Sequence, residues 1–254
     1  MTPRYLLARH VFVCMQGEHV VFLDIRNDRY FALEAARCAG LGCAVPGWPV
    51  PASFGLDTVR KGREATAAAL CEQVDEASLS GAISLLVEKG LLVPATSEGK
   101  RADATVFEPL RGDLTADSFE SRSRVAPLVF LRFISSAIRA RLLLRHRSFD
   151  SVIDRARRRA DRKRRHGTSM PQSDLHAFID AFSRLQPFFF AAKDACLVEA
   201  LALSEFLAGY GVFPSWVFGV QARPFAAHCW LQLDGIVLND TVDHVKRYTP
   251  IMVV

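Results

Sequence analysis

The sequence predicts an α+β protein with two domains. Short segments of alternating polar and apolar residues lie near both ends of the chain, at residues 10–33 and 215–240, and helical periodicity dominates between them. A polar segment at residues 96–123, poor in large aliphatic side chains, separates the two halves. We therefore expect a first domain at residues 1–95, a linker at residues 96–123 and a second domain at residues 124–254.

The composition is that of a folded protein. Half of the 254 residues are hydrophobic, so a sizeable core can be buried. The longest apolar run begins at Ala126 and is interrupted by Arg132, Arg139 and Arg141, so no membrane span is predicted. The N-terminus lacks the features of a signal peptide, and the six cysteines show no disulfide-framework spacing. A reducing cytoplasm is the simplest expected location.

Positive charge is concentrated in the second half of the chain. The formal net charge is +5, yet residues 1–100 hold 10 Lys+Arg against 11 Asp+Glu. The run from Arg155 to Arg165 contains eight basic residues and one acidic residue. Such a run binds nucleic acid, docks an acidic partner or forms a solvated helix face. We favour the solvated face, because no aromatic residues lie between the arginines to stack on bases.

The first domain is expected to contain three strands and a late helix. "HVFVCM", "HVVFLDI" and "YFAL" alternate with period two, and they are separated by a turn at Gly17 and by the turn signal "RNDR". The helix that follows has Ser78 as its expected N-cap and Gly90 as its terminating residue. A small sheet followed by helices therefore builds this domain.

The second domain is expected to begin with helices and to end with strands. Helical periodicity extends through Arg165, from Asp174 to about Leu185, and from Cys196 to about Gly209. The segments "SWVFGVQ", "AAHCWLQL" and "IVLND" then read as strands. The chain has neither an internal repeat nor a glycine-rich phosphate loop.

The last two strands carry a histidine and an aspartate. Side chains alternate along a strand, so His228 points to one face and Cys229 to the other, where we expect Cys229 to pack in the core. A three-residue turn with a bulge at Gly235 pairs His228 with Asp240, whereas a two-residue turn pairs it with Thr241. An aspartate opposite a histidine fixes its tautomer and stabilises the imidazolium, so this reading requires the bulged turn.

Cys196 is the candidate nucleophile. With Asp194 as N-cap, it falls in the first turn of its helix, where free N–H groups and the helix dipole favour a thiolate. Cys196, His228 and Asp240 then form a candidate catalytic triad, although Cys196 and His228 taken singly would read as core residues. Gln186 either donates to an oxyanion or ends a helix. Trp230 either shields the triad from water or packs in the core.

The segment "CLVEALAL…GYG…VFGV…FAAHCWLQLDGIVLND" resembles the lasso-peptide B protein, a transglutaminase-like cysteine protease that removes the leader from a lasso-peptide precursor. The resemblance implies a papain/transglutaminase-like α+β domain with Cys196 as nucleophile, His228 as base and Asp240 as orienting acid. "HCW" stands here where the family more often has "HAW", a small-for-small change that we place on the face away from the site.

The first third of the chain is similar to the peptide-recognition domain of these pathways, a winged-helix module related to the small pyrroloquinoline-quinone chaperone. The pattern of three strands, an "LD…N.RYFAL" segment and a late helix carries this similarity. It implies that the leader peptide adds as a strand beside the third strand and packs against the last helix. The residues expected to bind the leader are Arg29, Tyr30, Phe31, Leu33, Leu79, Ile83 and Leu86.

The expected function is therefore a leader peptidase that acts through a thioester acyl-enzyme. Its implied partners are the precursor and an asparagine-synthetase-like cyclase. We expect no metal and no cofactor, and any ATP dependence would act through the cyclase. Acyl transfer, as in transglutaminases and arylamine acetyltransferases, uses the same triad and stays open, as does a catalytically silent peptide-binding scaffold. Nucleic-acid binding is disfavoured, because the winged-helix part lacks the excess of basic residues that offsets phosphates.

Overall fold

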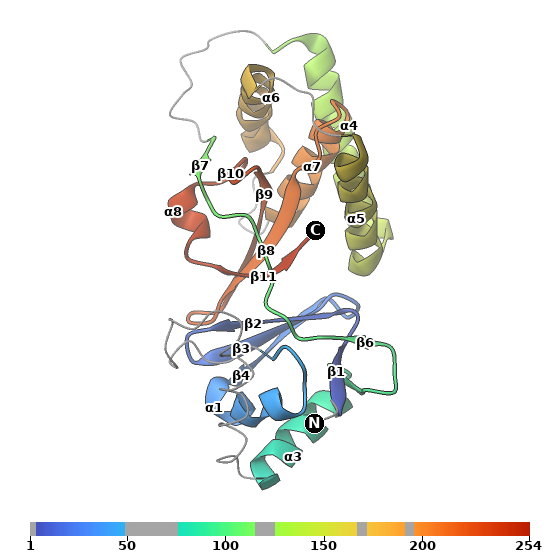
Figure 1. Cartoon of the computed structure of the whole chain (residues 1–254). Coiled ribbons are helices and arrows are strands. Elements are labelled where there is room, and N and C mark those ends of the chain that lie inside the picture. The colour runs from blue at the N-terminus through green and yellow to red at the C-terminus, as the bar shows by residue number, and fades with distance from the viewer. Residues whose placement is uncertain (1–3, 49–75, 115–124, 167–171, 191–195) are drawn as a thin grey trace. The chain divides into compact units, whose positions relative to one another are not determined.

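The computed structural model describes residues 4–48, 76–114, 125–166, 172–190 and 196–254 (Figure 1). Two compact units form the chain. The first comprises Met1–Val106, Val220–Ala226 and Thr249–Met252, and the second comprises Phe107–Gly219, Ala227–Tyr248 and Val253–Val254. Helices and strands occur in both, which confirms the predicted α+β class. The winged-helix form of the first domain stays a prediction.

The first unit contains two small antiparallel sheets. In one, β1 (Tyr5–Ala8) lies between β5 (Leu92–Pro94) and β6 (Gly99–Lys100). In the other, β3 (His19–Asp24) lies between β2 (Val11–Gln16) and β4 (Arg29–Glu34). These last three strands are the ones predicted at residues 10–33. β4 ends the order of its sheet, so it has a strand neighbour on one side only among the described residues.

Short helices complete the first unit. They are α1 (Ala35–Cys38), the 3-10 helix η1 (Ala39–Cys43) and α3 (Glu76–Glu88). Because α3 begins at Glu76, Ser78 lies inside the helix and the predicted N-cap there is wrong. The predicted end is confirmed: Gly90 has a φ of 70°, and the N–H of Leu91 donates to the carbonyl of Leu86 at 2.8 Å.

The second unit holds the longer helices. They are α4 (Pro127–His146), α5 (Phe149–His166), α6 (Gln172–Leu185), the 3-10 helix η3 (Gln186–Phe188) and α7 (Cys196–Ala208). α4 packs against α7 and also contacts α5 (Figure 1). In the described part of the chain, no helix combines the length and the apolar character that crossing a membrane requires.

Part of the basic run on α5 is turned inward. The carboxylate of Glu205 on α7 has only 1% of its side chain exposed, and it accepts hydrogen bonds from Arg155 at 3.3 Å and from Arg159 at 2.5 Å and 2.8 Å. Arg139 on α4 reaches the same carboxylate at 3.4 Å. The predicted solvated face therefore applies to only some of these arginines, because Arg155 and Arg159 form ion pairs with the buried Glu205.

A five-stranded sheet follows α7 in the chain. Its order is β11 (Thr249–Val253), β8 (Ser215–Gln221), β9 (Ala226–Leu233), β10 (Ile236–Val237) and β7 (Gly112–Asp113). β7 runs parallel to β10. The segment expected as a linker thus supplies β6 to one sheet and β7 to another. Cys43 is disulfide-bonded, which departs from the expectation of reduced cysteines.

Candidate active site

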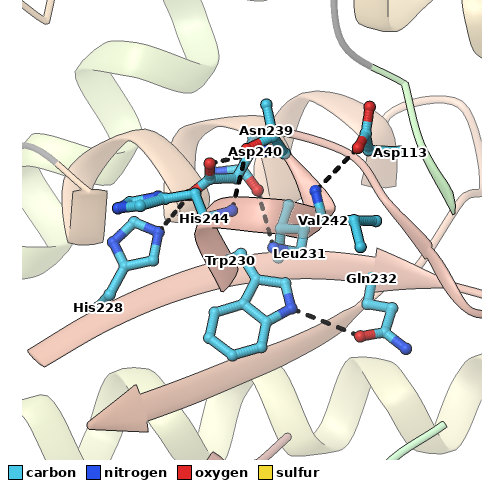
Figure 2. Close-up of polar contacts among 10 residues, drawn as sticks. Asp113, His228, Trp230, Leu231, Gln232, Asn239, Asp240, Val242 and His244 are labelled. Carbon is cyan, nitrogen blue, oxygen red and sulfur yellow. Dashed lines mark hydrogen bonds and ion pairs between the residues drawn. The ribbon is translucent and has the colours of Figure 1, made fainter. Parts of the chain in front are cut away.

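His228 and Asp240 meet at the end of the five-stranded sheet. His228 comes from β9, and Asp240 follows β10. The His228 Nε2 atom lies 2.5 Å from Asp240 Oδ2, and Figure 2 shows the ring edge directed at the carboxylate. Both side chains are about 15% exposed, at 15% and 14%. The pair is therefore largely shielded and still within reach of solvent.

The hairpin that leads to Asp240 has a two-residue turn, so the predicted bulged turn is wrong. Asp234 and Gly235 have φ values of 52° and 85°, the signs of a type I′ turn. Leu233 pairs with Ile236, and Gln232 pairs with Val237. In this register a continued strand would place His228 opposite Thr241.

Asp240 nevertheless reaches His228, because the strand ends before Asp240. The N–H of Leu238 still donates to the carbonyl of Leu231 at 2.9 Å. The next partner of Leu231 is a side chain: its N–H donates to Oδ1 of Asn239 at 2.8 Å (Figure 2). The chain then turns into the short helix α8 (Val242–Val245). Asp240 therefore lies beyond the strand, so the alternation of side chains along a strand does not turn its carboxylate away from His228.

Cys196 is the first residue of α7, in the helix turn where backbone N–H groups have no helical acceptor. Asp194, the expected N-cap, lies outside the described residues. A hydrogen bond from Cys229 has the largest effect on the pKa of Cys196. Burial alone would raise this pKa, but the bond from Cys229, together with a hydrogen bond from His228 and the charge of His228, lowers it to about 4. The sulfur is consequently a thiolate at neutral pH.

His228 is the positive partner of this thiolate. Burial favours the neutral ring, but hydrogen bonds to Asp240 and Cys196 outweigh it and raise the pKa of His228 to about 9. Burial also disfavours the Asp240 carboxylate, yet hydrogen bonds from His228 and His244 hold the pKa of Asp240 below its usual value. Because Nε2 faces Asp240, Nδ1 is the ring nitrogen available to the sulfur.

Cys229 is buried in the core, as predicted, but its predicted placement on the face away from the site is wrong, because it hydrogen-bonds to Cys196. It is 2% exposed, and burial raises its pKa well above the usual value, so it stays a thiol. The backbone N–H and C=O groups of Leu231 and Leu233 point toward β10. Because these directions repeat every two residues along a strand, the backbone groups of Cys229 point to the same side. β10 has ended at that point, and the sulfur of Cys196 accepts from both the backbone N–H and the thiol of Cys229.

Glu199 is a site residue that the sequence reasoning missed. It lies three residues after Cys196 on α7, which places it on the same side of the helix. Its carboxyl group hydrogen-bonds to Asn239 and to Gln186, the candidate oxyanion donor. Burial raises the pKa of Glu199 to about 7, and the nearby Cys196 and Asp240 also raise it. The helical spacing from Cys196 is visible in the sequence and could have indicated Glu199, whereas its contacts with Asn239 and Gln186 could not have been predicted from the sequence.

His244 is a second missed residue. Its Nδ1 atom lies 2.8 Å from Asp240 Oδ2, the same oxygen that His228 contacts (Figure 2). The ligand atoms of His228, Asp240 and His244 lie within 4.8 Å of one another, a spacing at which a metal ion can bind. Hydrogen bonds between the two rings and one carboxylate already account for this arrangement.

Trp230 packs against the ring of His228. The ring of Trp230 is stacked on that of His228 with centroids 6.1 Å apart, and Trp230 is 1% exposed. Gly219 on β8 makes room for it, because an added Cβ would lie 2.9 Å from Cζ3 of Trp230 and 2.8 Å from Cβ of Tyr248. The glycine in "VFGV" is thus needed for close packing behind the site.

The residues expected to bind a leader lie on β4 and α3. Leu33 and Leu86 are buried in the core of the first unit, at 9% and 0% exposure. Phe31, Leu79 and Ile83 are partly buried at its margin. The remaining two residues differ: Tyr30 is partly exposed, and exposed Arg29 hydrogen-bonds to Asp24 and to the carbonyl of Lys89.

Comparison with known families identifies the second half of the chain. Residues 134–253 match the model of the transglutaminase-like superfamily, and the match includes Cys196, His228 and Asp240. None of the curated proteins and none of the solved structures matches the chain. This part of the protein is a transglutaminase-like domain, which indicates cysteine-protease-like or acyltransferase-like activity.

Proposed function

We propose that the protein is a cysteine peptidase that removes the leader of a lasso-peptide precursor. The observation that carries the proposal is the chain of contacts from a half-buried thiolate at Cys196, through His228, to the Asp240 carboxylate. This arrangement supplies a nucleophile, a proton donor and an orienting acid in the order that acyl transfer from a peptide requires.

The reaction begins with attack of the Cys196 thiolate on the scissile carbonyl carbon. The backbone N–H of Cys196 and the amide of Gln186 donate to the developing oxyanion. The imidazolium of His228 gives its proton to the leaving amine, and the leader remains as a thioester on Cys196. His228, now neutral, takes a proton from water as that water attacks the thioester carbonyl. The tetrahedral intermediate then expels the Cys196 thiolate, which re-forms the ion pair with the His228 imidazolium and frees the leader acid.

Glu199 holds Gln186 in place for this step. A carboxyl group with a pKa of about 7 is mostly protonated below that pH. The hydrogen bonds with Gln186 and Asn239 lower this pKa, so both side-chain amides donate to the carboxyl oxygens of Glu199. We infer that Glu199 is a positioning residue that acts on the oxyanion donor.

The first unit is proposed to capture the leader. β4 is an edge strand among the described residues, and an extended peptide can pair with the backbone of an edge strand. Leu79 and Ile83 on α3 offer partly buried apolar contacts. Capture at this unit raises the effective concentration of the scissile bond at Cys196, so the catalytic site itself need not bind tightly.

The test of catalysis is incubation with a precursor peptide from the same gene neighbourhood, followed by mass spectrometry. The wild type should yield leader and core, and Cys196→Ala should yield neither. Asp240→Asn should be strongly slowed, whereas Asp243→Asn, at an exposed residue of the short helix α8 that follows Asp240, should retain wild-type activity. Unchanged processing by Cys196→Ala would remove the triad from the mechanism.

The test of leader capture is a titration of labelled leader peptide. Ile83→Asp should weaken binding at least tenfold, and Ser80→Asp, at an exposed position of the same helix, should not. Cys196→Ala should bind as the wild type does. Equal binding by the two aspartate variants would place the leader elsewhere.

Acyl transfer to an amine is the second candidate function, because the superfamily match covers this chemistry. It differs from hydrolysis only in the group that attacks the thioester. Adding a primary amine to the precursor reaction separates the two: a product carrying the mass of the amine supports transfer, and free leader acid supports hydrolysis.

A further inference from the structure

Helix α4 carries an apolar face that is exposed among the residues that the structure describes. Its buried face consists of Phe133, Ser136, Ala137 and Ala140, as expected for a helix that packs on α7. A second set of residues points the other way at intervals of three and four, which is the seam pattern of a coiled coil. This set, here called the α4 seam, is Leu128, Leu131, Ser135, Ile138 and Leu142.

The α4 seam is open to solvent and forms one continuous surface. Leu128 and Leu131 are 66% and 62% exposed, and Ile138 and Leu142 are 52% and 51% exposed. A hollow of about 660 Å³ runs along it, and its lining includes Leu131, Ser135, Ile138 and Leu142. Four large aliphatic side chains exposed in a row on one helix are a pattern typical of a binding surface.

The charges beside the seam are all positive. At 100° per residue, Arg132 and Arg139 flank one side of the seam and Arg141 flanks the other, the positions that set partner choice in coiled coils. Arg132 donates to the carbonyl of Gly209 at 2.7 Å, and Arg141 donates to the carbonyl of Phe189. Carbonyl contacts leave a guanidinium charge uncompensated.

Only one of these flanking cations contacts a carboxylate, as far as the described residues show: Arg139 shares Glu205 with Arg155 and Arg159. α4 itself contains no acidic residue. A second copy of the chain would bring basic flanks against basic flanks, which disfavours self-association through this seam. A helix with acidic flanks would instead meet complementary charge.

We propose that the α4 seam docks an amphipathic helix of another protein, with aliphatic residues along its seam and Asp or Glu beside them. The seam spans residues 128–142, about 21 Å of helix axis, which is enough for two heptads of the partner. This inference does not depend on the proposed peptidase activity, because it uses none of the site residues.

The test uses two synthetic 21-residue helical peptides with leucine at both seam positions. One carries Glu beside the seam and the other carries Lys, and binding to the full-length protein is followed by fluorescence anisotropy. The Glu peptide should bind at least tenfold more tightly than the Lys peptide, and raising the salt from 50 to 500 mM should weaken it.

Two variants locate the surface. Ile138→Glu and Leu142→Glu should each weaken binding of the Glu peptide at least tenfold, whereas Val106→Glu, at a residue that is 91% exposed elsewhere, should not. Circular dichroism checks that the variants are folded. Equal binding of both peptides, no binding below 1 mM, or self-association in sedimentation that Ile138→Glu abolishes would overturn the proposal.

Discussion

Replacing Glu199 by Gln should flatten the pH dependence of the free energy of unfolding. The carboxyl has a pKa of about 7 in the folded protein, against 4.5 as the ordinary value. Between these two pH values the folded state holds a proton that the unfolded state has released. The stabilisation is therefore fully present below pH 4.5 and is lost as pH rises through 7.

The magnitude follows from the difference between the two pKa values. A difference of 2.5 corresponds to at most about 3 kcal/mol at 1.36 kcal/mol per pKa unit, and partial exposure of Glu199 reduces it. Glutamine keeps the hydrogen-bonding shape and cannot ionise. When the pH rises from 4.5 to 8, the free energy of unfolding of the wild type should thus fall by about 1–3 kcal/mol more than that of Glu199→Gln.

The assay is urea unfolding of both proteins at pH 4.5, 6 and 8, followed by circular dichroism. Comparing the two proteins at each pH cancels the contributions of other titrating groups. A difference that stays constant within about 0.5 kcal/mol across this range would refute the reasoning, because it would mean that Glu199 ionises with an ordinary pKa.

Three further substitutions test the surroundings of the site. Asp240→Asn should lower the pKa of His228 by about 1–3, since the ring loses an opposite charge, and an imidazole NMR titration measures it; an unchanged pKa contradicts the pairing. Glu205→Gln should cost about 1–3 kcal/mol in urea unfolding, because three partly exposed arginines lose their buried counter-charge; a loss below about 0.5 kcal/mol contradicts this. Gly219→Ala should cost about 1–3 kcal/mol and alter the near-UV dichroism of Trp230, and an unchanged spectrum would show that the packing tolerates the added methyl group.

Periodicity was sufficient to predict most of the elements. The three strands at residues 10–33 and the helix that begins at Cys196 depend on local alternation and spacing, which act over a few residues and are visible in the sequence. The end of α3 was predictable for the same reason, because Gly90 adopts a positive φ. The start of α3 was not, since serine also occurs within helices.

The contact between His228 and Asp240 forms for a different reason from the one predicted. The register of the final hairpin depends on whether the turn has two or three residues, and "DG" is compatible with both. The structure has the two-residue turn, and Asp240 reaches His228 because Asn239 ends the strand with a side-chain hydrogen bond. Contacts of this kind depend on tertiary structure, as do those of Glu199 and Cys229.

The measurement that tests the central claim most directly is the pH dependence of Cys196 alkylation by iodoacetamide, followed on its tryptic peptide. With a pKa of about 4, Cys196 is almost fully thiolate at pH 6. A thiol with a pKa of 9.0 would be about 0.1% thiolate at that pH. Low-pKa thiolates are intrinsically slower nucleophiles, by about a hundredfold over this range, so the shape of the profile is more informative than the rate. The account predicts a rate that changes less than about threefold between pH 6 and 8, and a rise of about a hundredfold over the same interval would contradict it.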